Sequence, residues 1–252
     1  MTSARLLPAL ALALLSPAMV ACGGDGGDDG TTLTVYAASS LKATFEQVAE
    51  EFEQANDGVE VELVLGGSSD LVSQIQDGAE GDVFASADEA NMDKLGDDER
   101  GREPEVFATN TLQIATPPDN PAGVESLQDL AGSDVDLVLC APEVPCGAAA
   151  ARVAEAAGLE LEPVSEEQSV ADVLGKITSG QADAGLVYVT DVIAAGDDVA
   201  GIEFPEAADA VNSYPITTLA TSEEADLAAA FVELVLGATG QGILADAGFG
   251  TP

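Results

Sequence analysis

The chain has 252 residues, of which 46 are acidic and 7 are basic, and its formal net charge is −39. Such a charge repels nucleic acid and anionic lipid, which excludes proteins that bind the phosphate backbone of DNA or RNA. The apolar fraction of 46% is nevertheless that of a folded protein, which excludes an acidic disordered chain.

The N-terminus predicts export and a lipid anchor. Residues 6–20 form an apolar run that contains two prolines and is shorter than the roughly 20 residues that span a bilayer, as in a signal peptide. Cys22 follows this run, and its flanks resemble the lipobox of bacterial lipoproteins. We therefore expect residues 1–21 to be removed, Cys22 to be lipidated, and the Gly- and Asp-rich residues 22–30 to be a flexible tether. An ordinary cleaved signal with an incidental cysteine is the alternative.

Strand-like and helix-like segments alternate along the rest of the chain. The first are a strand at 33–37, a helix at 41–53, a strand at 59–65, a helix at 70–77 and a strand at 82–86. In the middle come a strand at 111–116, a short helix from 127, a strand at 136–140, helices at 147–157 and 170–179, and a strand at 184–188. The last are a strand at 216–220 and helices at 225–236 and 240–247. This alternation predicts an α/β protein with helices covering parallel strands. No second apolar stretch in the sequence is long enough to span a membrane.

Cys140 and Cys146 are the cysteines beyond Cys22, and an even pair in an exported chain predicts a disulfide. Their spacing and the absence of histidine argue against a zinc site or a redox CxxC motif. A bridge would stabilise the fold by about 2 kcal/mol and fix the loop between the cysteines. Two free thiols are the alternative.

The sequence offers little catalytic machinery. It has no histidine, the commonest general base and metal ligand. It also has no Walker loop, no GxSxG elbow and no HExxH motif. We therefore expect no enzymatic activity and no cofactor.

Four turns share one pattern, in which small residues precede a predicted helix. They are AASS at 37–40, GGSS at 66–69, PCG at 145–147 and QSV at 168–170. Helix N-termini offer unpaired N–H groups and a partial positive charge, and serine hydroxyls add further donors. Each turn alone fits ordinary N-capping, but four together predict an anion site where the strands end. Neutral donors without an acceptor favour a fully deprotonated oxyanion, because hydrogen phosphate needs an acceptor for its hydrogen.

The landmarks of the chain resemble the molybdate-binding proteins of ABC importers, the ModA family, over essentially all of residues 31–252. The matching motifs are TVYAASSL at 34–41, GGSSDLVSQI at 66–75, GDVFASAD at 81–88, EVPCGAAA at 143–150, GLVYVTDV at 185–192, SYPITTLA at 213–220 and AGFG at 247–250. The resemblance implies a two-lobed, type II-like periplasmic-binding-protein fold with two mixed sheets flanked by helices. It places the first lobe at 31–109 and 217–252 and the second at 110–216. The implied hinge crossovers lie near 109–116 and 214–218.

The resemblance also implies which residues hold the ion. The hydrogen-bond donors would be the hydroxyls of Ser40, Ser68 and Tyr188 and the backbone N–H groups of Cys146 and Val170. Ser39 and Ser69 are possible secondary donors, and Asp70 is expected to point away from the ion. The metal would be bound only as its oxyanion, without direct ligands from the protein.

The implied ligand is molybdate or tungstate, and the implied protein partner is the permease of an ABC importer. The receptor would be monomeric, would bind no nucleic acid, and would be held on the outer face of the cell membrane by the lipid on Cys22. Two alternatives stay open: a receptor for sulfate or phosphate, and an interaction or adhesion lipoprotein that has lost its ligand.

Overall fold

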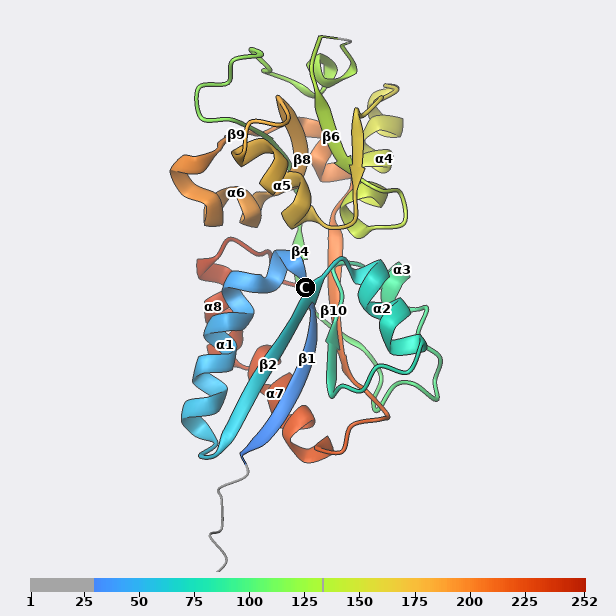
Figure 1. Cartoon of the computed structure of the whole chain (residues 1–252), viewed down its shortest axis with the longest axis vertical. Helices are drawn as coiled ribbons and strands as arrows, with labels where there is room; N and C mark the ends of the chain where they lie inside the picture. The colour runs from blue at the N-terminus through green and yellow to red at the C-terminus, as the bar shows by residue number, and fades with distance from the viewer. Residues whose placement is uncertain (1–29, 133) are drawn as a thin grey trace, which may run out of the picture.

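Two five-stranded sheets organise the chain into two lobes, one above the other along the long axis (Figure 1). The computed structural model describes residues 30–132 and 134–252. Strand order is β2-β1-β3-β10-β4 in the first sheet and β7-β6-β8-β5-β9 in the second. In each sheet the fourth strand in order runs antiparallel to both of its neighbours, and the other four strands run in one direction. The predicted α/β fold with two mixed sheets is confirmed.

The first lobe is built from both ends of the chain. It contains β1 (Thr31–Ala38), the 3-10 turn η1 (Ser39–Leu41), α1 (Lys42–Ala55), β2 (Val59–Gly66), α2 (Ser68–Gln76), β3 (Val83–Ala85), α3 (Glu89–Met92), β4 (Glu105–Asn110), β10 (Asn212–Thr218), α7 (Ala225–Leu236) and α8 (Ala238–Asp246). Alternate residues of β1 face opposite sides of the sheet. Val35 packs in the core beneath α1 and α7, whereas Tyr36 packs with α2 and α3 on the other side.

The second lobe is one continuous segment. It contains β5 (Leu112–Thr116), η2 (Leu127–Ala131), β6 (Leu137–Cys140), α4 (Pro145–Ala157), β7 (Ser165–Glu167), α5 (Val170–Thr178), β8 (Ala184–Tyr188), α6 (Val189–Ala195), η3 (Gly196–Asp198), β9 (Ala200–Ile202) and η4 (Pro205–Asp209). Strands β6 and β8 are buried along their whole length, as expected of strands covered on both faces. Helix α4 ends at Gly158, whose φ of 67° is the left-handed geometry of a helix C-cap.

The chain passes twice between the lobes, and the second passage differs from the prediction. The first lies between β4 and β5, within the expected 109–116. The second precedes Asn212, because residues 212–216 pair with β4 and β3 in the first sheet rather than belonging to the second lobe. Pro215 lies inside β10, which begins four residues before the predicted strand, and the register shifts between Tyr214 and Pro215 and accommodates the proline. The crossover predicted at 214–218 was therefore placed too late.

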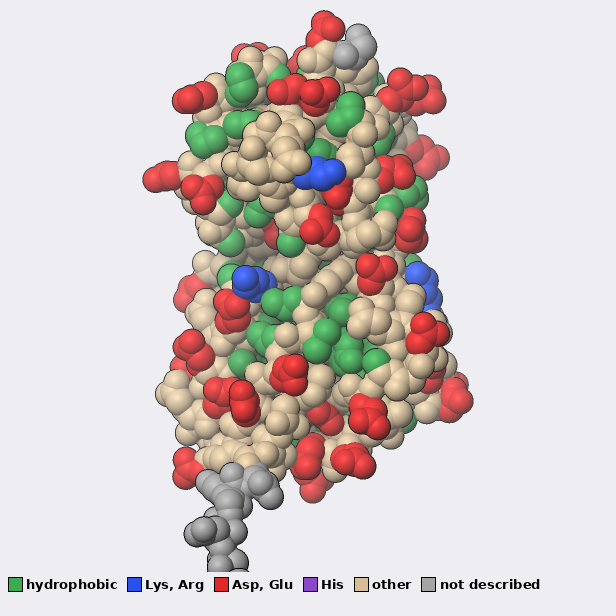
Figure 2. All heavy atoms as spheres, in the orientation of Figure 1, with side chains coloured by type: hydrophobic (Ala, Val, Ile, Leu, Met, Phe, Trp, Pro, Cys, Tyr) green, Lys and Arg blue, Asp and Glu red, His purple; other side chains and the backbone are tan. Residues whose placement is uncertain are grey.

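Acidic side chains are scattered over both lobes on the face shown in Figure 2, with few basic ones among them. Among the described residues, ion pairs link Arg102 to Glu105 and Lys176 to Glu167. No single described helix has the length and apolar composition to cross a membrane. Helices α7 and α8 meet these criteria only together, across a bend of 54°, and their buried residues pack in the core of the first lobe.

Candidate functional site

A small hollow lies between the lobes, where the N-termini of four helical segments meet the end of β8. Its cavity volume is about 10 Å³. Its lining includes all five residues that the sequence singled out as primary donors, namely Ser40, Ser68, Cys146, Val170 and Tyr188. These residues come from five separate segments of the chain and from both lobes, so the fold brings them together. That they bind an ion stays a prediction.

The first lobe contributes two serine hydroxyls. Ser40 lies in η1, and its Oγ is 3.1 Å from Oη of Tyr214, with either atom able to donate. Ser68 is the first residue of α2, two residues earlier than the helix start expected from the sequence. Its Oγ accepts a hydrogen bond of 3.0 Å from the backbone N–H of Ala87. Because a protein donor already occupies the Ser68 oxygen, its own hydrogen is available to an acceptor in the hollow.

The second lobe contributes helix N-termini. Helix α4 begins at Pro145, again two residues earlier than expected, so Cys146 lies in its first turn. Val170 is the first residue of α5, where the side chain of Ser169 accepts a bond from the backbone N–H of Asp172. The first N–H groups of a helix have no intrahelical acceptor, and the helix dipole makes them partly positive. The two turns therefore present backbone donors suited to an anion.

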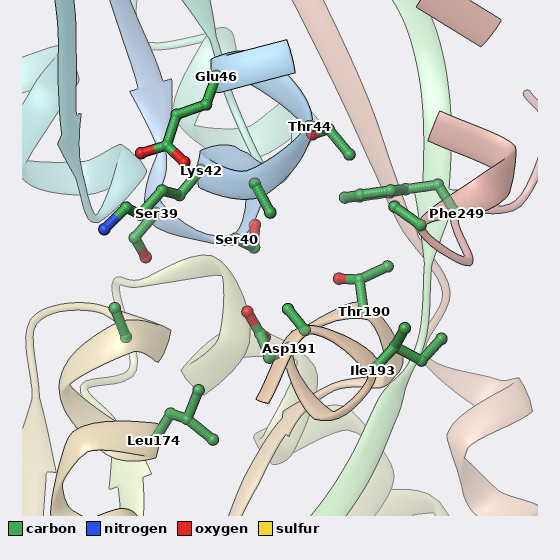
Figure 3. Close-up of a pocket in the computed structure, with 14 residues that line it drawn as sticks. Ser39, Ser40, Lys42, Thr44, Glu46, Leu174, Thr190, Asp191, Ile193 and Phe249 are labelled. Atoms are coloured by element: carbon green, nitrogen blue, oxygen red, sulfur yellow. The ribbon is translucent and has the colours of Figure 1, made fainter. Parts of the chain in front are cut away.

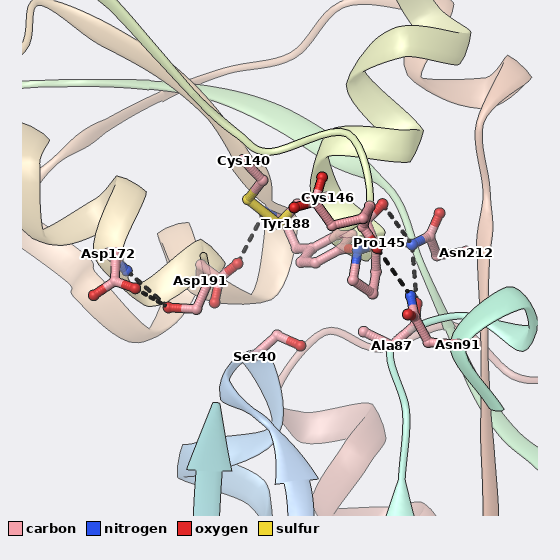
Figure 4. The surroundings of a disulfide bond; sticks show 12 residues. Ser40, Ala87, Asn91, Cys140, Pro145, Cys146, Asp172, Tyr188, Asp191 and Asn212 are labelled. Atoms are coloured by element: carbon pink, nitrogen blue, oxygen red, sulfur yellow. Dashed lines mark hydrogen bonds between the residues drawn. A yellow bond between two sulfur atoms is a disulfide. The ribbon is translucent and has the colours of Figure 1, made fainter. Parts of the chain in front are cut away.

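The predicted disulfide between Cys140 and Cys146 is confirmed, with a Cα–Cα distance of 5.7 Å (Figure 4). It joins the last residue of β6 to the first turn of α4. The backbone of Cys146 is thereby tied to a buried strand, which limits movement of its N–H group.

Tyr188 ends β8, and its hydroxyl is buried between the lobes. Its ring packs edge-on against that of Tyr214, with centroids 5.9 Å apart. Burial raises the pKa of Tyr188 well above its ordinary value, and the neighbouring Tyr214 and Asp191 raise it further. Burial likewise raises the pKa of Tyr214. Both phenols therefore keep their hydrogens and can donate hydrogen bonds at neutral pH.

The two secondary donor candidates, Ser39 and Ser69, differ in their position relative to the hollow. Ser39 lines the hollow, but Ser69 does not. Ser69 is buried, and its Oγ has no hydrogen-bond partner among the described residues. Asp70 is exposed and does not line the hollow, as expected.

Sequence reasoning missed several residues around the hollow. Asn212 donates a hydrogen bond of 2.8 Å to the Tyr188 hydroxyl, and Tyr214 contacts Ser40. Tyr214 stands within a motif that carried the family resemblance, so that signal could have found it. Asn212 lies one residue before the motif and gave no such signal.

Asp191 is a buried carboxyl beside the hollow. It lies in the first turn of α6 and accepts a 2.9 Å hydrogen bond from the backbone N–H of Tyr188. Burial raises its pKa to about 7, an effect that this hydrogen bond partly opposes. The group is therefore part neutral and part charged at neutral pH.

A second, larger cavity of about 330 Å³ adjoins the first, and it lies between α1 and the C-terminal segment on one side and α5 and α6 on the other (Figure 3). Its exposed lining is mostly apolar, with Leu174, Ile193 and Phe249 among the contributors. Asp191 also borders it, and Ser39 and Ser40 line both cavities. Within residues 30–132 and 134–252, no three or more Cys, Asp or Glu side chains cluster in a way that could hold a metal ion.

Comparison with known proteins places this geometry in a family. Residues 33–250 match the family model described as bacterial extracellular solute-binding protein. The chain is 43% identical to the molybdate-binding protein ModA of Mycobacterium tuberculosis, over 96% of this chain and 97% of that protein. It is 29% identical to ModA of Escherichia coli, over 79% and 81% of the two chains.

Solved structures agree with the sequence matches. The periplasmic molybdate-binding protein of Azotobacter vinelandii has a TM-score of 0.77 and 25% identity, over 87% of this chain and 99% of that one. The sulfate-binding protein SubI of Mycobacterium tuberculosis shares the fold with a TM-score of 0.73 and 18% identity, over 87% and 86% of the two chains. The chain belongs to the ModA family of bacterial extracellular solute-binding proteins.

Proposed function

We propose that this protein is an extracytoplasmic receptor that binds molybdate or tungstate between its lobes and delivers the ion to an ABC importer. The observation that carries the proposal is the small buried hollow, which is lined by hydrogen-bond donors from both lobes. Ser40, Ser68 and Tyr188 supply hydroxyls, and Cys146 and Val170 supply backbone N–H groups. The names of its relatives support the choice of ion.

Neutral donors are sufficient for useful affinity. A hydrogen bond to a charged partner contributes about 1.5–3 kcal/mol, so five contribute roughly 8–15 kcal/mol. Micromolar binding requires about 8 kcal/mol, and the remainder offsets the loss of rotational and translational freedom. No basic side chain is needed at the ion, which fits a site whose lining includes no Lys or Arg.

The ion is cargo, and the proposal includes no resident cofactor, no catalytic step and no direct protein ligand to the metal. Anchoring on the outer face of the cell membrane is part of the proposal and is supported by the sequence around Cys22. That segment lies outside the described residues. A mass spectrum of the native protein should show lipid on Cys22, and a mature chain without it would contradict the anchor.

Titration calorimetry with molybdate, tungstate, sulfate and phosphate tests the proposed function. We expect binding of molybdate and tungstate at micromolar or lower concentration and much weaker binding of the other two. Tight sulfate or phosphate binding would make the chain a receptor for that ion instead. The absence of heat and of thermal stabilisation with all four would favour an interaction lipoprotein that keeps the fold without the ligand.

A further inference from the structure

A hydrogen-bonded chain leads from the surface of the second lobe to the hollow. Arg152 lies on α4, and its Nη2 donates a 2.6 Å hydrogen bond to Oδ1 of Asn212 at the start of β10. Asn212 is 2% exposed, and its Nδ2 donates at 2.8 Å to Oη of Tyr188. Figure 4 shows Asn212 beside Tyr188 and Pro145, at the junction of the two lobes.

The orientation of the Asn212 amide is set by its partners. Arginine can only donate, so the oxygen of the amide must face Arg152. The nitrogen faces two backbone carbonyls, that of Ala87 at 2.9 Å and that of Pro145 at 3.4 Å. Arg152 and the two carbonyls therefore all require the same orientation of the amide. In this orientation the amide nitrogen faces Tyr188, so the hydroxyl oxygen of Tyr188 accepts its hydrogen bond.

This arrangement decides what Tyr188 can offer to a ligand. A phenol has one hydrogen and two lone pairs, and the amide of Asn212 occupies one of these lone pairs, so the hydrogen of Tyr188 points away from Asn212. The Ser68 hydroxyl likewise accepts from the N–H of Ala87, whereas in the pair of Ser40 and Tyr214 either hydroxyl can be the donor. The hydrogens of Tyr188 and Ser68 are therefore left for a ligand, and part of the acceptor capacity of both oxygens is already used.

We propose that Asn212, oriented by Arg152, is a specificity-determining residue: it keeps the Tyr188 hydroxyl a donor and so disfavours oxyanions that carry a hydrogen. This inference rests on the proposed function. Molybdate, tungstate and sulfate carry no hydrogen at neutral pH, whereas phosphate retains at least one. A hydrogen phosphate ion would place its hydrogen against another hydrogen or leave it unpaired in a buried site, which costs affinity.

The test is Asn212→Asp, which keeps the size of the side chain and its acceptor for Arg152 but removes both amide hydrogens. The Tyr188 hydroxyl then donates to the new carboxylate and turns its oxygen toward the hollow. We expect molybdate and sulfate affinities to fall together by about 10- to 100-fold, while hydrogen phosphate affinity changes much less. Competition titrations at pH 8 give all three ions a similar charge, so the added carboxylate repels them alike.

Three companion variants give the experiment its controls. Asn56→Asp makes the same chemical change at the far end of α1, roughly 20 Å along the helix from η1, and should leave all affinities within about twofold. In a Tyr188→Phe background, Asn212→Asp should no longer change the ratio of phosphate to molybdate affinity. If Asn212→Asp does not fold, Asn212→Leu serves in its place, because it also removes the donor and frees the Tyr188 oxygen.

The outcomes are separable. A wild-type protein that binds none of these ions refutes the proposed function and this inference with it. A wild-type protein that prefers molybdate, together with a folded Asn212 variant in which all three affinities fall equally, refutes this inference alone. In that case Asn212 only holds the lobes together. The inference is supported if the affinity for molybdate relative to that for phosphate is lower in the Asn212 variant than in the wild type by about tenfold or more.

Discussion

Two adjoining cavities between the lobes differ in size and in chemistry. The smaller one, about 10 Å³, is lined by hydroxyl and N–H donors, whereas the larger one, about 330 Å³, has a mostly apolar lining. The largest apolar pocket is commonly taken as the ligand site of a protein. Here the density of buried donors points to the smaller cavity, because a small oxyanion is held by converging hydrogen bonds rather than by apolar area.

The position of Asp191 is a further difference between the two cavities, because this carboxyl lines only the larger one. Its carboxyl borders the larger cavity and lies opposite Ser40 in Figure 3. An anion in the larger cavity would meet this carboxyl directly. The donor-lined hollow does not include Asp191 in its lining, and the carboxylate already accepts a hydrogen bond from the N–H of Tyr188.

The largest effect is expected from Gly67→Ala, which keeps the lobes apart. A Cβ atom on Gly67 would lie 2.0 Å from the carbonyl oxygen of Gln168 in the opposite lobe. The donors of the second lobe could then not reach an ion held by the first, and molybdate affinity should fall by about 100-fold or more. Gly242→Ala in α8 is the matched control, since its Cβ would meet open space. Calorimetry that finds Gly67→Ala as tight as Gly242→Ala would contradict closure at this point.

The next prediction is that the adjacent serines Ser68 and Ser69 differ in their effect on molybdate affinity. Ser68→Ala removes a proposed donor to the ion and leaves the N–H of Ala87 without its partner, so molybdate affinity should fall by about 10- to 100-fold. Ser69→Ala removes a buried hydroxyl that has no partner among the described residues, so affinity should stay within about twofold and thermal stability should not fall. Calorimetry and thermal unfolding of both variants decide the point. Equal losses of affinity would show that the hollow is not the site.

The smallest effect concerns pH. Burial raises the pKa of Asp191 to about 7, so the group is neutral below that pH and charged above it. Molybdate affinity should therefore fall by about three- to tenfold as pH rises from 6 to 8. In Asp191→Asn this step should vanish, while Asp246→Asn, the same change at an exposed position, should retain it. A step of equal size in all three proteins would assign the titration to another group.

The same raised pKa has a consequence for stability. The unfolded carboxyl titrates near pH 4, so between about pH 4 and 7 the folded protein binds the extra proton. The contribution of Asp191 to the free energy of unfolding therefore decreases as pH rises through this interval. Asp191→Asn should remove this part of the pH dependence in denaturant titrations.

Local patterns were enough to predict much of the fold, and the family resemblance named the five residues that line the hollow. Apolar runs identified β1, β2 and β8, and the spacing of apolar residues identified α1. The four turns of small residues were visible because a strand end followed by a serine or glycine and a helix is a short-range signal. The cysteine pair was equally local.

What the sequence did not reveal depends on contacts between distant segments. Pro215 hid the start of β10, because tolerance of a proline depends on the register with a neighbouring strand. The short elements β7, α6 and β9 have too few residues for a clear period. Asn212 gained its role only when the fold placed it between Arg152 and Tyr188, 60 and 24 residues away in the chain. The environment that shifts the pKa of Asp191 is equally a product of tertiary burial.

The most direct test of the central claim is to locate the metal. Crystals grown with tungstate allow tungsten to be placed by its anomalous scattering. We expect one strong peak in the donor-lined hollow, with its oxygens within hydrogen-bonding distance of Ser40, Ser68, Cys146, Val170 and Tyr188. A peak in the larger cavity or only on the surface, with the hollow free of tungsten, would contradict the account.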